Sequence, residues 1–208
     1  MKKYIFPFIL IVNSIFFACN NSDEFNSTEI GNQIWMSKNL NLDRFQNGDV
    51  IPEAKTKSEW ENSIRDKKPA WCYCDNDSIK GKKYGKFYNW YAIIDSRGLA
   101  PKGWRLPNKN DVNILIENSG GETIGGKKLK SKSGWYSNGN GTDNYGLSIL
   151  PGGFLDQNGQ FSNEFGLGTF WILSINNPQF VVFDYFHDEI NINPCDKTYG
   201  FYVRCIKN

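Results

Sequence analysis

Cys19 is the residue whose type and position point to a definite chemistry, the acylation of a processed amino terminus. It follows a segment that begins with Lys2 and Lys3 and continues as an apolar run over residues 6–17. A basic start, a short apolar middle and a small residue before the cut are typical of a secretory signal peptide. The run is shorter than the roughly 20 apolar residues that span a bilayer. We therefore predict a signal peptide over residues 1–18.

The segment Phe16-Phe17-Ala18-Cys19 resembles the lipobox of bacterial lipoproteins. The resemblance implies that Cys19 becomes the acylated first residue, held at a membrane by chains that contribute about 0.8 kcal/mol per buried methylene. The polar segment 20–24 resembles the leader of surface-exported lipoproteins of Bacteroidota-type bacteria. We expect a lipid-anchored protein of the outer membrane, exposed on the cell surface, with residues 19–28 as a tether. A plain cleaved leader with an incidental Cys19, followed by a solvated spacer, is the alternative.

Four further cysteines, Cys72, Cys74, Cys195 and Cys205, could form disulfides or bind a metal. An even number in an exported chain predicts two disulfides, each typically worth about 2–4 kcal/mol. Cys72 and Cys74 cannot bridge each other without strain, so each would reach Cys195 or Cys205. A zinc site of four thiolates is one alternative, which an oxidising compartment disfavours. A reactive pair at Cys72 and Cys74 is another, but nothing in the sequence indicates the lowered thiol pKa that it needs.

The segment 137–144 is rich in oxygen atoms that a metal could use. Asn138, Asn140 and Asp143 offer ligands to calcium, which takes six to eight oxygens. With one carboxylate and no EF-hand spacing, the segment is better explained by side chains that bond to their own backbone in turns. Calcium is the one cofactor that the sequence leaves open.

Trp135 and Tyr136 precede this segment, and we expect both rings to be exposed. Flat aromatic faces with polar tips stack on sugar rings and bond their hydroxyls. Together with Asp143 and Asn144, the two aromatic residues form the predicted ligand-contact surface.

His187 is the only histidine, so histidine-dependent catalysis or metal binding rests on one residue. Asp184, Asp188 and Glu189 could converge on a metal with it. The alternation of side chains along a strand instead scatters them to both faces, which favours polar residues that follow a buried strand.

The charge balance argues against a nucleic-acid partner. The chain has 24 basic and 22 acidic residues, and the basic ones include Lys2 and Lys3 of the leader. Nucleic-acid binders need clustered positive charge. We expect the lysine-rich segments 80–83 and 127–130 to be solvated surface. With 39% apolar and 15% aromatic residues, the chain is globular in composition.

The remaining pattern predicts an α+β domain over residues 29–208. The segment Thr56–Glu59 has capping-box spacing and begins a helix that stops before Pro69. Asn108 is the N-cap of a second helix that stops at Gly120. A short helix is expected in the second half of 84–94. Helices early and strands late indicate a small mixed or antiparallel sheet. The expected strands are 30–36, 147–150, 169–173, 180–186 and 199–206.

Several segments, in order along the chain, resemble one family, the Fibrobacter succinogenes major paralogous domain. They are Ile30–Leu40, Asn47–Asp49, Ala70–Cys72, Asp75–Asp77, Tyr84–Ala92, Arg97–Pro107, Gly126–Ser131, Gly141–Gly146, Leu150–Gly153 and Gly200–Cys205. The segment Gly103–Pro107 is similar to one in C-type-lectin-like domains and formylglycine-generating enzymes. The resemblance implies a C-type-lectin-like fold with two short helices, a small sheet closed by the terminal strands, and long loops. It also implies that Cys72 pairs with Cys205 and Cys74 with Cys195.

The chain departs from that family's pattern at Val112, in the segment 170–174, and at the additional Cys74 and Cys195. No well-established activity comes with the family. We expect a non-catalytic binding or adhesion module that presents loops to a glycan or a protein. The alternatives are a structural envelope protein without a ligand and an enzyme related to the formylglycine-generating ones.

Overall fold

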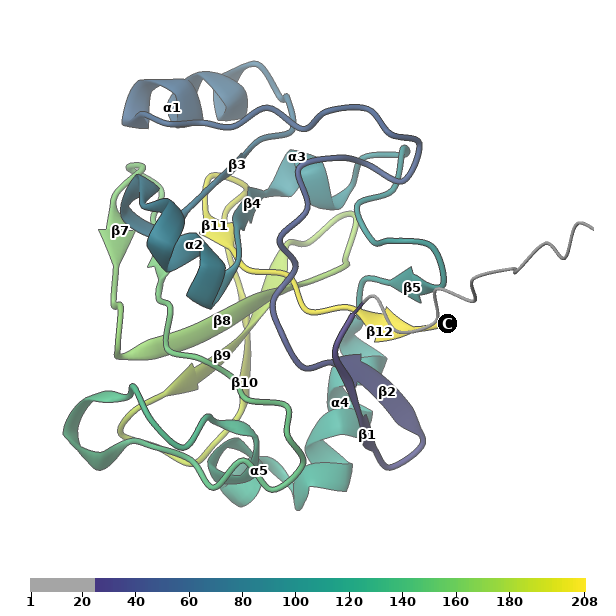
Figure 1. Ribbon diagram of the computed structural model, residues 1–208, viewed down its shortest axis with the longest axis vertical. Coiled ribbons are helices and arrows are strands. Elements are labelled where there is room, and N and C mark those ends of the chain that lie inside the picture. Colours follow the sequence, from purple (N-terminus) through teal and green to yellow (C-terminus); the bar gives the residue numbers. More distant parts are fainter. Residues whose placement is uncertain (1–24) are drawn as a thin grey trace, which may run out of the picture.

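The first and last strands of the described chain belong to one sheet, in which β2 lies between them, so both ends of the domain are on the same side of the molecule (Figure 1). The computed structural model describes residues 25–208. Every ladder of this sheet is antiparallel, and Ile206 in the last strand pairs with Trp35 in the second. In spatial order the strands are β1 (Ser27–Ile30), β2 (Gln33–Met36), β12 (Ile206–Lys207) and β5 (Trp104–Arg105).

The predicted signal peptide and Cys19 lie outside the described residues. The predicted tether is two residues too long, because Ser27 and Thr28 already belong to β1 and pair with Met36 and Trp35.

Two further antiparallel sheets complete the described structure. One has the order β3 (Trp71–Cys72), β4 (Phe87–Asn89), β11 (Gly200–Phe201), β6 (Phe154–Leu155) and β7 (Phe161–Ser162). The other has the order β10 (Asn191–Pro194), β9 (Gln179–Asp184) and β8 (Leu167–Ile172). A bridge between Phe170 and Tyr202 ties the two together. The α+β class is therefore confirmed.

The predicted strand 199–206 is in fact two short strands, β11 and β12, which belong to different sheets. The predicted strand 147–150 is wrong: only Ile149 makes a bridge, to Lys130.

Both predicted helices and the short third one are present. α1 (Lys57–Arg65) begins with the Thr56–Glu59 capping box. α4 (Lys109–Ser119) has Asn108 and Asp111 in the same reciprocal arrangement and ends at Gly120, which has a φ of 111°. Such caps satisfy backbone N–H groups that have no partner within the helix. α3 (Trp90–Ile93) is the short helix.

Two helices were not predicted, α2 (Ser78–Tyr84) and α5 (Glu122–Leu129), because both contain glycines that lower helix propensity. Tertiary packing explains these glycines. A Cβ on Gly81 would lie 2.1 Å from the Tyr73 ring, and one on Gly126 would lie 2.6 Å from the carbonyl oxygen of Asp188. Close approach, and not helix propensity, selects glycine at these positions.

The core is divided into two packed clusters. One surrounds Trp35 and Phe170 beneath α4, and the other surrounds Trp90 and Trp171, whose rings lie 5.2 Å apart. Among the described residues, no helix has both the length and the apolar character needed to cross a bilayer.

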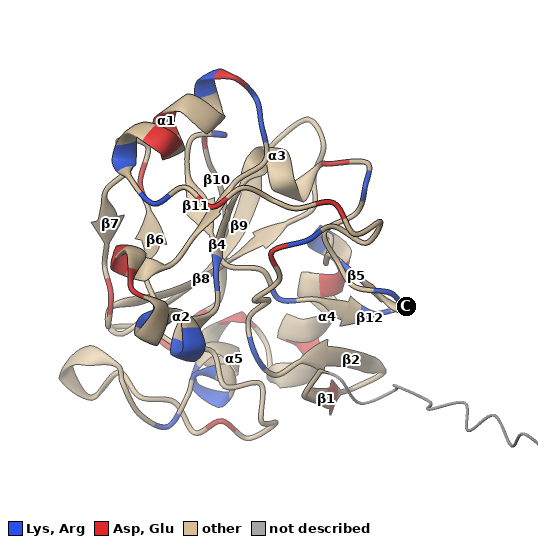
Figure 2. Cartoon of the chain, turned by 45° about the horizontal axis from the view of Figure 1, so that its top comes forward, with Lys and Arg blue, Asp and Glu red and all other residues tan. Residues whose placement is uncertain are grey.

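Basic and acidic residues alternate over the elements, as along α1 (Figure 2). One predicted surface lysine, however, is core. Lys130 is 1% exposed, and its ammonium donates to the carbonyl oxygens of Asp184 (2.9 Å) and His187 (2.8 Å). These bonds replace lost hydration and fix the turn after β9.

Candidate binding groove

A groove of about 550 Å³ opens between the β6–β7 hairpin and the β9–β10 hairpin. Its floor comes from β11, whose strand neighbour is β6, and from the outer face of β9. The volume lies within the range of about 300–1,000 Å³ that is usual for small-ligand sites.

Stacked aromatic rings form the floor of the groove. Phe180 and Phe201 are parallel within 8°, with their ring centres 4.2 Å apart, and Tyr199 is parallel to Phe201 within 4° at 5.7 Å. Tyr199 and Phe201 share a face because side chains two residues apart point to the same side of a strand. Phe154 leans against both at about 6 Å. Phe201 is 1% exposed and supports the other three, which are partly exposed.

Uncharged polar groups surround these rings. Gln157, Asn163 and Asn193 line the groove and are exposed. Within residues 25–208, their side-chain amides have no hydrogen-bond partner, so both donors and acceptors face solvent. Asp196 is the one charged residue among the lining residues, and its carboxylate accepts from the backbone N–H of Thr198 at 3.0 Å. The groove thus combines an apolar floor with amide groups and carries at most one negative charge.

The predicted contact surface at 135–144 is only partly present. Tyr136 is 53% exposed, as expected, and packs against Phe165 and Tyr185. The prediction for Trp135 is wrong: it is 6% exposed, and its indole N–H donates to Ser131 Oγ at 3.0 Å. An indole with a partner for its N–H packs into the core at little cost.

The predicted calcium ligands serve the turn itself. Asn140 Oδ1 accepts from the Trp135 backbone N–H at 3.0 Å, and Asp143 Oδ1 accepts from the Ser148 N–H at 2.8 Å. Asn138 and Asp143 have φ values of 64° and 46°, a conformation that asparagine and aspartate tolerate. Asn144 is exposed nearby. These contacts support the turn interpretation, and calcium binding at the three residues stays a prediction.

His187 is exposed and forms a local pair with Asp184. The distance from its Nδ1 to Asp184 Oδ2 is 2.9 Å, and Asp184 Oδ1 also accepts from the His187 backbone N–H at 2.7 Å. The hydrogen bond to the carboxylate raises the pKa of the imidazole. Asp188 lies instead beside Lys130, 3.5 Å away. The residues thus stabilise the turn after β9, in line with the preferred interpretation.

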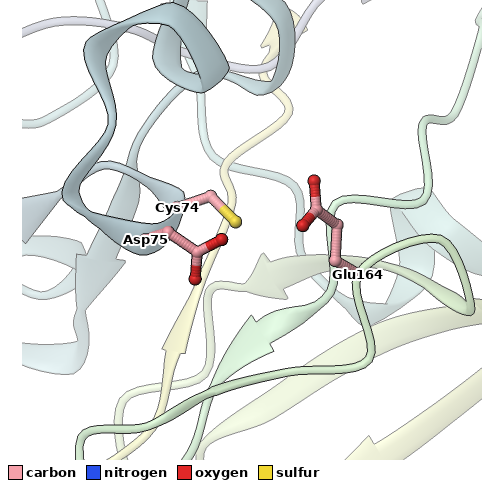
Figure 3. Close-up of side chains that lie close together, drawn as sticks. All are labelled: Cys74, Asp75 and Glu164. Carbon is pink, nitrogen blue, oxygen red and sulfur yellow. The ribbon is translucent and has the colours of Figure 1, made fainter.

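One thiol and two carboxylates converge beside α2, where Figure 3 shows Cys74, Asp75 and Glu164. One ligand atom from each lies within 4.8 Å of the others. Lys80 already occupies this position, because its ammonium pairs with both Asp75 and Glu164. These two carboxylates raise the pKa of Lys80. The cluster is therefore a small ion-pair network that joins α2 to the loop after β7.

The four cysteines are free thiols, so the predicted disulfides are absent from the described structure. Cys72 and Cys74 belong to the core cluster around Trp35, whereas Cys205 belongs to the other cluster, with Cys195 packed against it. Each of the disulfides that the family resemblance implies, Cys72 with Cys205 and Cys74 with Cys195, would therefore have to link one core cluster to the other. Burial raises the pKa of Cys74 and of Cys205 to about 12, which opposes thiolate formation.

Cys195 should react with a thiol reagent before the other three cysteines of the domain. It is partly exposed in the groove, whereas Cys72, Cys74 and Cys205 are at most 2% exposed. Peptide mapping by mass spectrometry, after brief treatment of the native chain with N-ethylmaleimide, measures the order. The Cys195→Ser variant should leave the domain unlabelled until it is denatured. A peptide in which Cys72 is linked to Cys205 would contradict the free-thiol structure.

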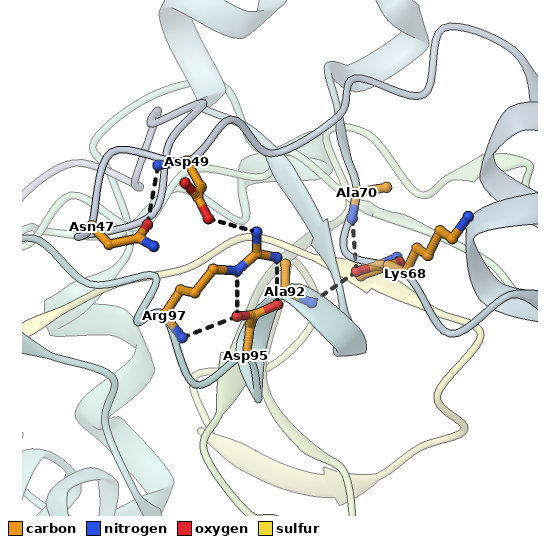
Figure 4. Close-up of polar contacts among 8 residues, drawn as sticks. Asn47, Asp49, Lys68, Ala70, Ala92, Asp95 and Arg97 are labelled. Atoms are coloured by element: carbon orange, nitrogen blue, oxygen red, sulfur yellow. Dashed lines mark hydrogen bonds and ion pairs between the residues drawn. The ribbon is translucent and has the colours of Figure 1, made fainter.

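A separate network orders the loop before α1, as Figure 4 shows. The Arg97 guanidinium binds both oxygens of Asp95 (2.9 and 2.8 Å), reaches Asp49 at 3.1 Å, and lies 4.1 Å from the centre of the Phe45 ring. The hydrogen bonds from Arg97 hold the pKa of Asp95 below its usual value. Because each charge has a partner, this network is structural.

The groove was missed in the sequence because its residues come from five strands and the turns between them. The one local signal is the alternation Tyr199-Gly200-Phe201, which places two aromatic rings on one face of a strand. The partner ring, Phe180, is known only from the sheet topology.

Fold and sequence together define the class of this protein, a single α+β domain with an aromatic groove. The family model described as Fibrobacter succinogenes major domain matches residues 28–207. The chain therefore belongs to that family. Neither the curated proteins nor the solved structures contain a match to it.

Proposed function

We propose that this chain is a lipid-anchored binding or adhesion module of the cell envelope, and that the aromatic groove is its contact site. The observation that carries the proposal is the row of partly exposed rings of Phe154, Phe180 and Tyr199 beside side-chain amides that have no hydrogen-bond partner within residues 25–208. Natural proteins rarely expose apolar patches without a use. The ligand class is a glycan or a protein on another surface.

The position of the groove suits an anchored module. In both views, β1 and the carboxyl terminus lie on one side of the molecule, whereas β7 lies on the opposite side (Figures 1 and 2). The β6–β7 hairpin contributes one wall of the groove. An anchor at Cys19 would precede β1, so the groove would face away from the membrane. The expected place is the outer membrane, on the cell surface.

We assign the domain to the C-type-lectin-like folds. Three features support this assignment: terminal strands in one sheet, the two longest helices α1 and α4 at separate positions, and long loops between short strands. Rigid scaffolds with variable loops are a common basis for binding sites.

A non-catalytic role fits the chemistry of the candidate groups. Burial raises the pKa values of Cys72, Cys74 and Cys195, which is the opposite of what a reactive thiol needs. The only histidine pairs with its neighbour Asp184 on the surface. A purely structural envelope protein is the other candidate, and it gives no reason for partly exposed aromatic rings in a groove.

Tyr199→Ala should weaken adhesion at least about fivefold, since loss of one stacking ring typically costs about 1–3 kcal/mol. Outer-membrane vesicles that carry the full chain would be measured for retention on immobilised polysaccharides, mucin and matrix proteins. Tyr136→Ala is the matched control, because it removes an exposed tyrosine outside the groove. Equal retention of the wild type, both variants and empty vesicles on every surface would contradict the proposal.

A further inference from the structure

We infer that the ligand of the groove is an uncharged glycan, bound by stacking of a sugar ring on Tyr199 and Phe154. The inference rests on the proposed function and adds the ligand class. Four properties of the groove point to it: ring geometry, amide chemistry, charge and size.

The geometry of the rings fits a pyranose. Tyr199 and Phe154 lie 5.9 Å apart and are inclined by 39°, so together they form a shallow apolar trough, with Phe201 buried behind them. One face of a pyranose consists of C–H groups, whose burial on such a surface contributes about 25 cal/mol per Å². The tyrosine hydroxyl adds a polar group at the edge of the trough.

The polar groups fit hydroxyls. Asn163, Asn193 and Gln157 each carry a carbonyl acceptor and an NH₂ donor. A sugar hydroxyl also donates and accepts, so each amide can pair with it in either direction. Because these amides have no partner within the described residues, a ligand would displace only water from them.

The charge of the groove disfavours anions. Asp196 is the only charged lining residue, and no lysine or arginine lines the groove in the described chain. Lys197 follows Asp196 and is exposed, but it does not line the groove. A uronate, sulfate or phosphate group would therefore meet a carboxylate without a cation to pair with, and like charges at close range repel.

The size of the groove disfavours a folded protein. A stable protein interface buries about 800 Å² on each partner, whereas a concavity of 300–1,000 Å³ is usual for small ligands. At about 550 Å³, the groove fits a short stretch of sugar chain.

The test compares neutral and anionic oligosaccharides of equal length. The full chain, purified in a detergent without a sugar headgroup, is titrated by calorimetry with cellohexaose, maltohexaose, mannohexaose and chitohexaose, and with hexagalacturonate. At least one neutral hexasaccharide should bind, and hexagalacturonate should bind at least about tenfold more weakly. Tyr199→Ala should weaken binding of the neutral probe at least about fivefold. Asn193→Ala, at an exposed position, should weaken it about threefold to tenfold without affecting folding.

One variant serves as the control. Tyr136→Ala should leave the affinity unchanged, because it removes an exposed tyrosine outside the groove.

Several outcomes overturn the inference. Binding of hexagalacturonate alone refutes the neutral ligand but leaves the groove as a contact site. Binding of a neutral probe that is insensitive to Tyr199→Ala and Asn193→Ala places the sugar elsewhere. If no hexasaccharide binds, the inference fails, and the proposed function then depends on Tyr199-dependent retention on protein surfaces.

Discussion

Asn89→Ala should lower the free energy of unfolding by about 4 kcal/mol, because four hydrogen bonds depend on one fully buried side chain. Its Oδ1 accepts from the backbone N–H groups of Ala70 (3.1 Å) and Ala92 (3.0 Å). Its Nδ2 donates to the carbonyl oxygen of Lys68 (2.8 Å) and to Ser63 Oγ (3.2 Å). Alanine would leave buried donors without partners and remove the N-cap of α3.

Denaturant unfolding of the variant and the wild type measures this loss. A loss of about 4 kcal/mol corresponds to roughly 8–16 °C in melting temperature for a domain of this size. Asn108→Ala is the matched control: it removes an asparagine with the same capping role from α4, but at an exposed position, and should cost about 1 kcal/mol. If the two variants lost the same free energy of unfolding, the four hydrogen bonds of Asn89 would contribute no more than a helix cap, and the prediction would be wrong.

The Asn89 network also supports the groove. Asn89 pairs with Gly200 in the ladder between β4 and β11, and Gly200 lies between Tyr199 and Phe201 in the chain. A Cβ at Gly200 would lie 2.8 Å from the Trp60 ring, so α1 packs directly on this strand. Weakening the network should therefore disturb the stacked rings.

Arg204→Met should cost about 3 kcal/mol, because it leaves two buried carbonyl acceptors and one partly buried amide acceptor without a donor. The guanidinium donates to Asn39 Oδ1 (3.1 Å) and to the carbonyl oxygens of Met36 (3.0 Å) and Leu147 (2.9 Å). Burial lowers the pKa of Arg204, so part of the loss is offset when the desolvated charge is removed. The lost bonds outweigh this relief because methionine cannot donate to any of the three oxygens.

Thermal unfolding compares Arg204→Met with Arg65→Met, whose side chain is 69% exposed and which should change stability by less than about 0.5 kcal/mol. Arg204→Lys should be intermediate, since an ammonium can satisfy some of the acceptors. An Arg204→Met variant as stable as the wild type would contradict this prediction. It would mean that the desolvation cost of the buried guanidinium is as large as the stabilisation from its hydrogen bonds.

The sequence predicted what depends on local chemistry. Thr56 and Asn108 begin their helices as expected, since the capping side chain and its partner lie three residues apart. It failed where distant contacts decide. Lys130 belongs to a lysine-rich segment that is typical of a surface, yet its side chain is buried, because the carbonyl oxygens of Asp184 and His187 accept hydrogen bonds from its ammonium.

The same limit applies to the site. Trp135 was expected outside because it borders a polar turn, yet Ser131 provides a partner for its indole and allows burial. The disulfide prediction assumed that even counts imply pairs, whereas Cys72 and Cys205 pack in different clusters. The groove depends on rings from β6, β9 and β11, which only the three-dimensional arrangement of the strands brings together.

The central claim is that the aromatic groove is the contact site. Its most direct test is nuclear magnetic resonance of the full chain with ¹⁵N-labelled asparagine and glutamine, titrated with a neutral hexasaccharide that binds. The account predicts that the side-chain amide signals of Asn163, Asn193 and Gln157 shift together, while those of Asn138, Asn140 and Asn144 stay in place. Shifts confined to the 138–144 segment, with the groove signals unmoved, would contradict it.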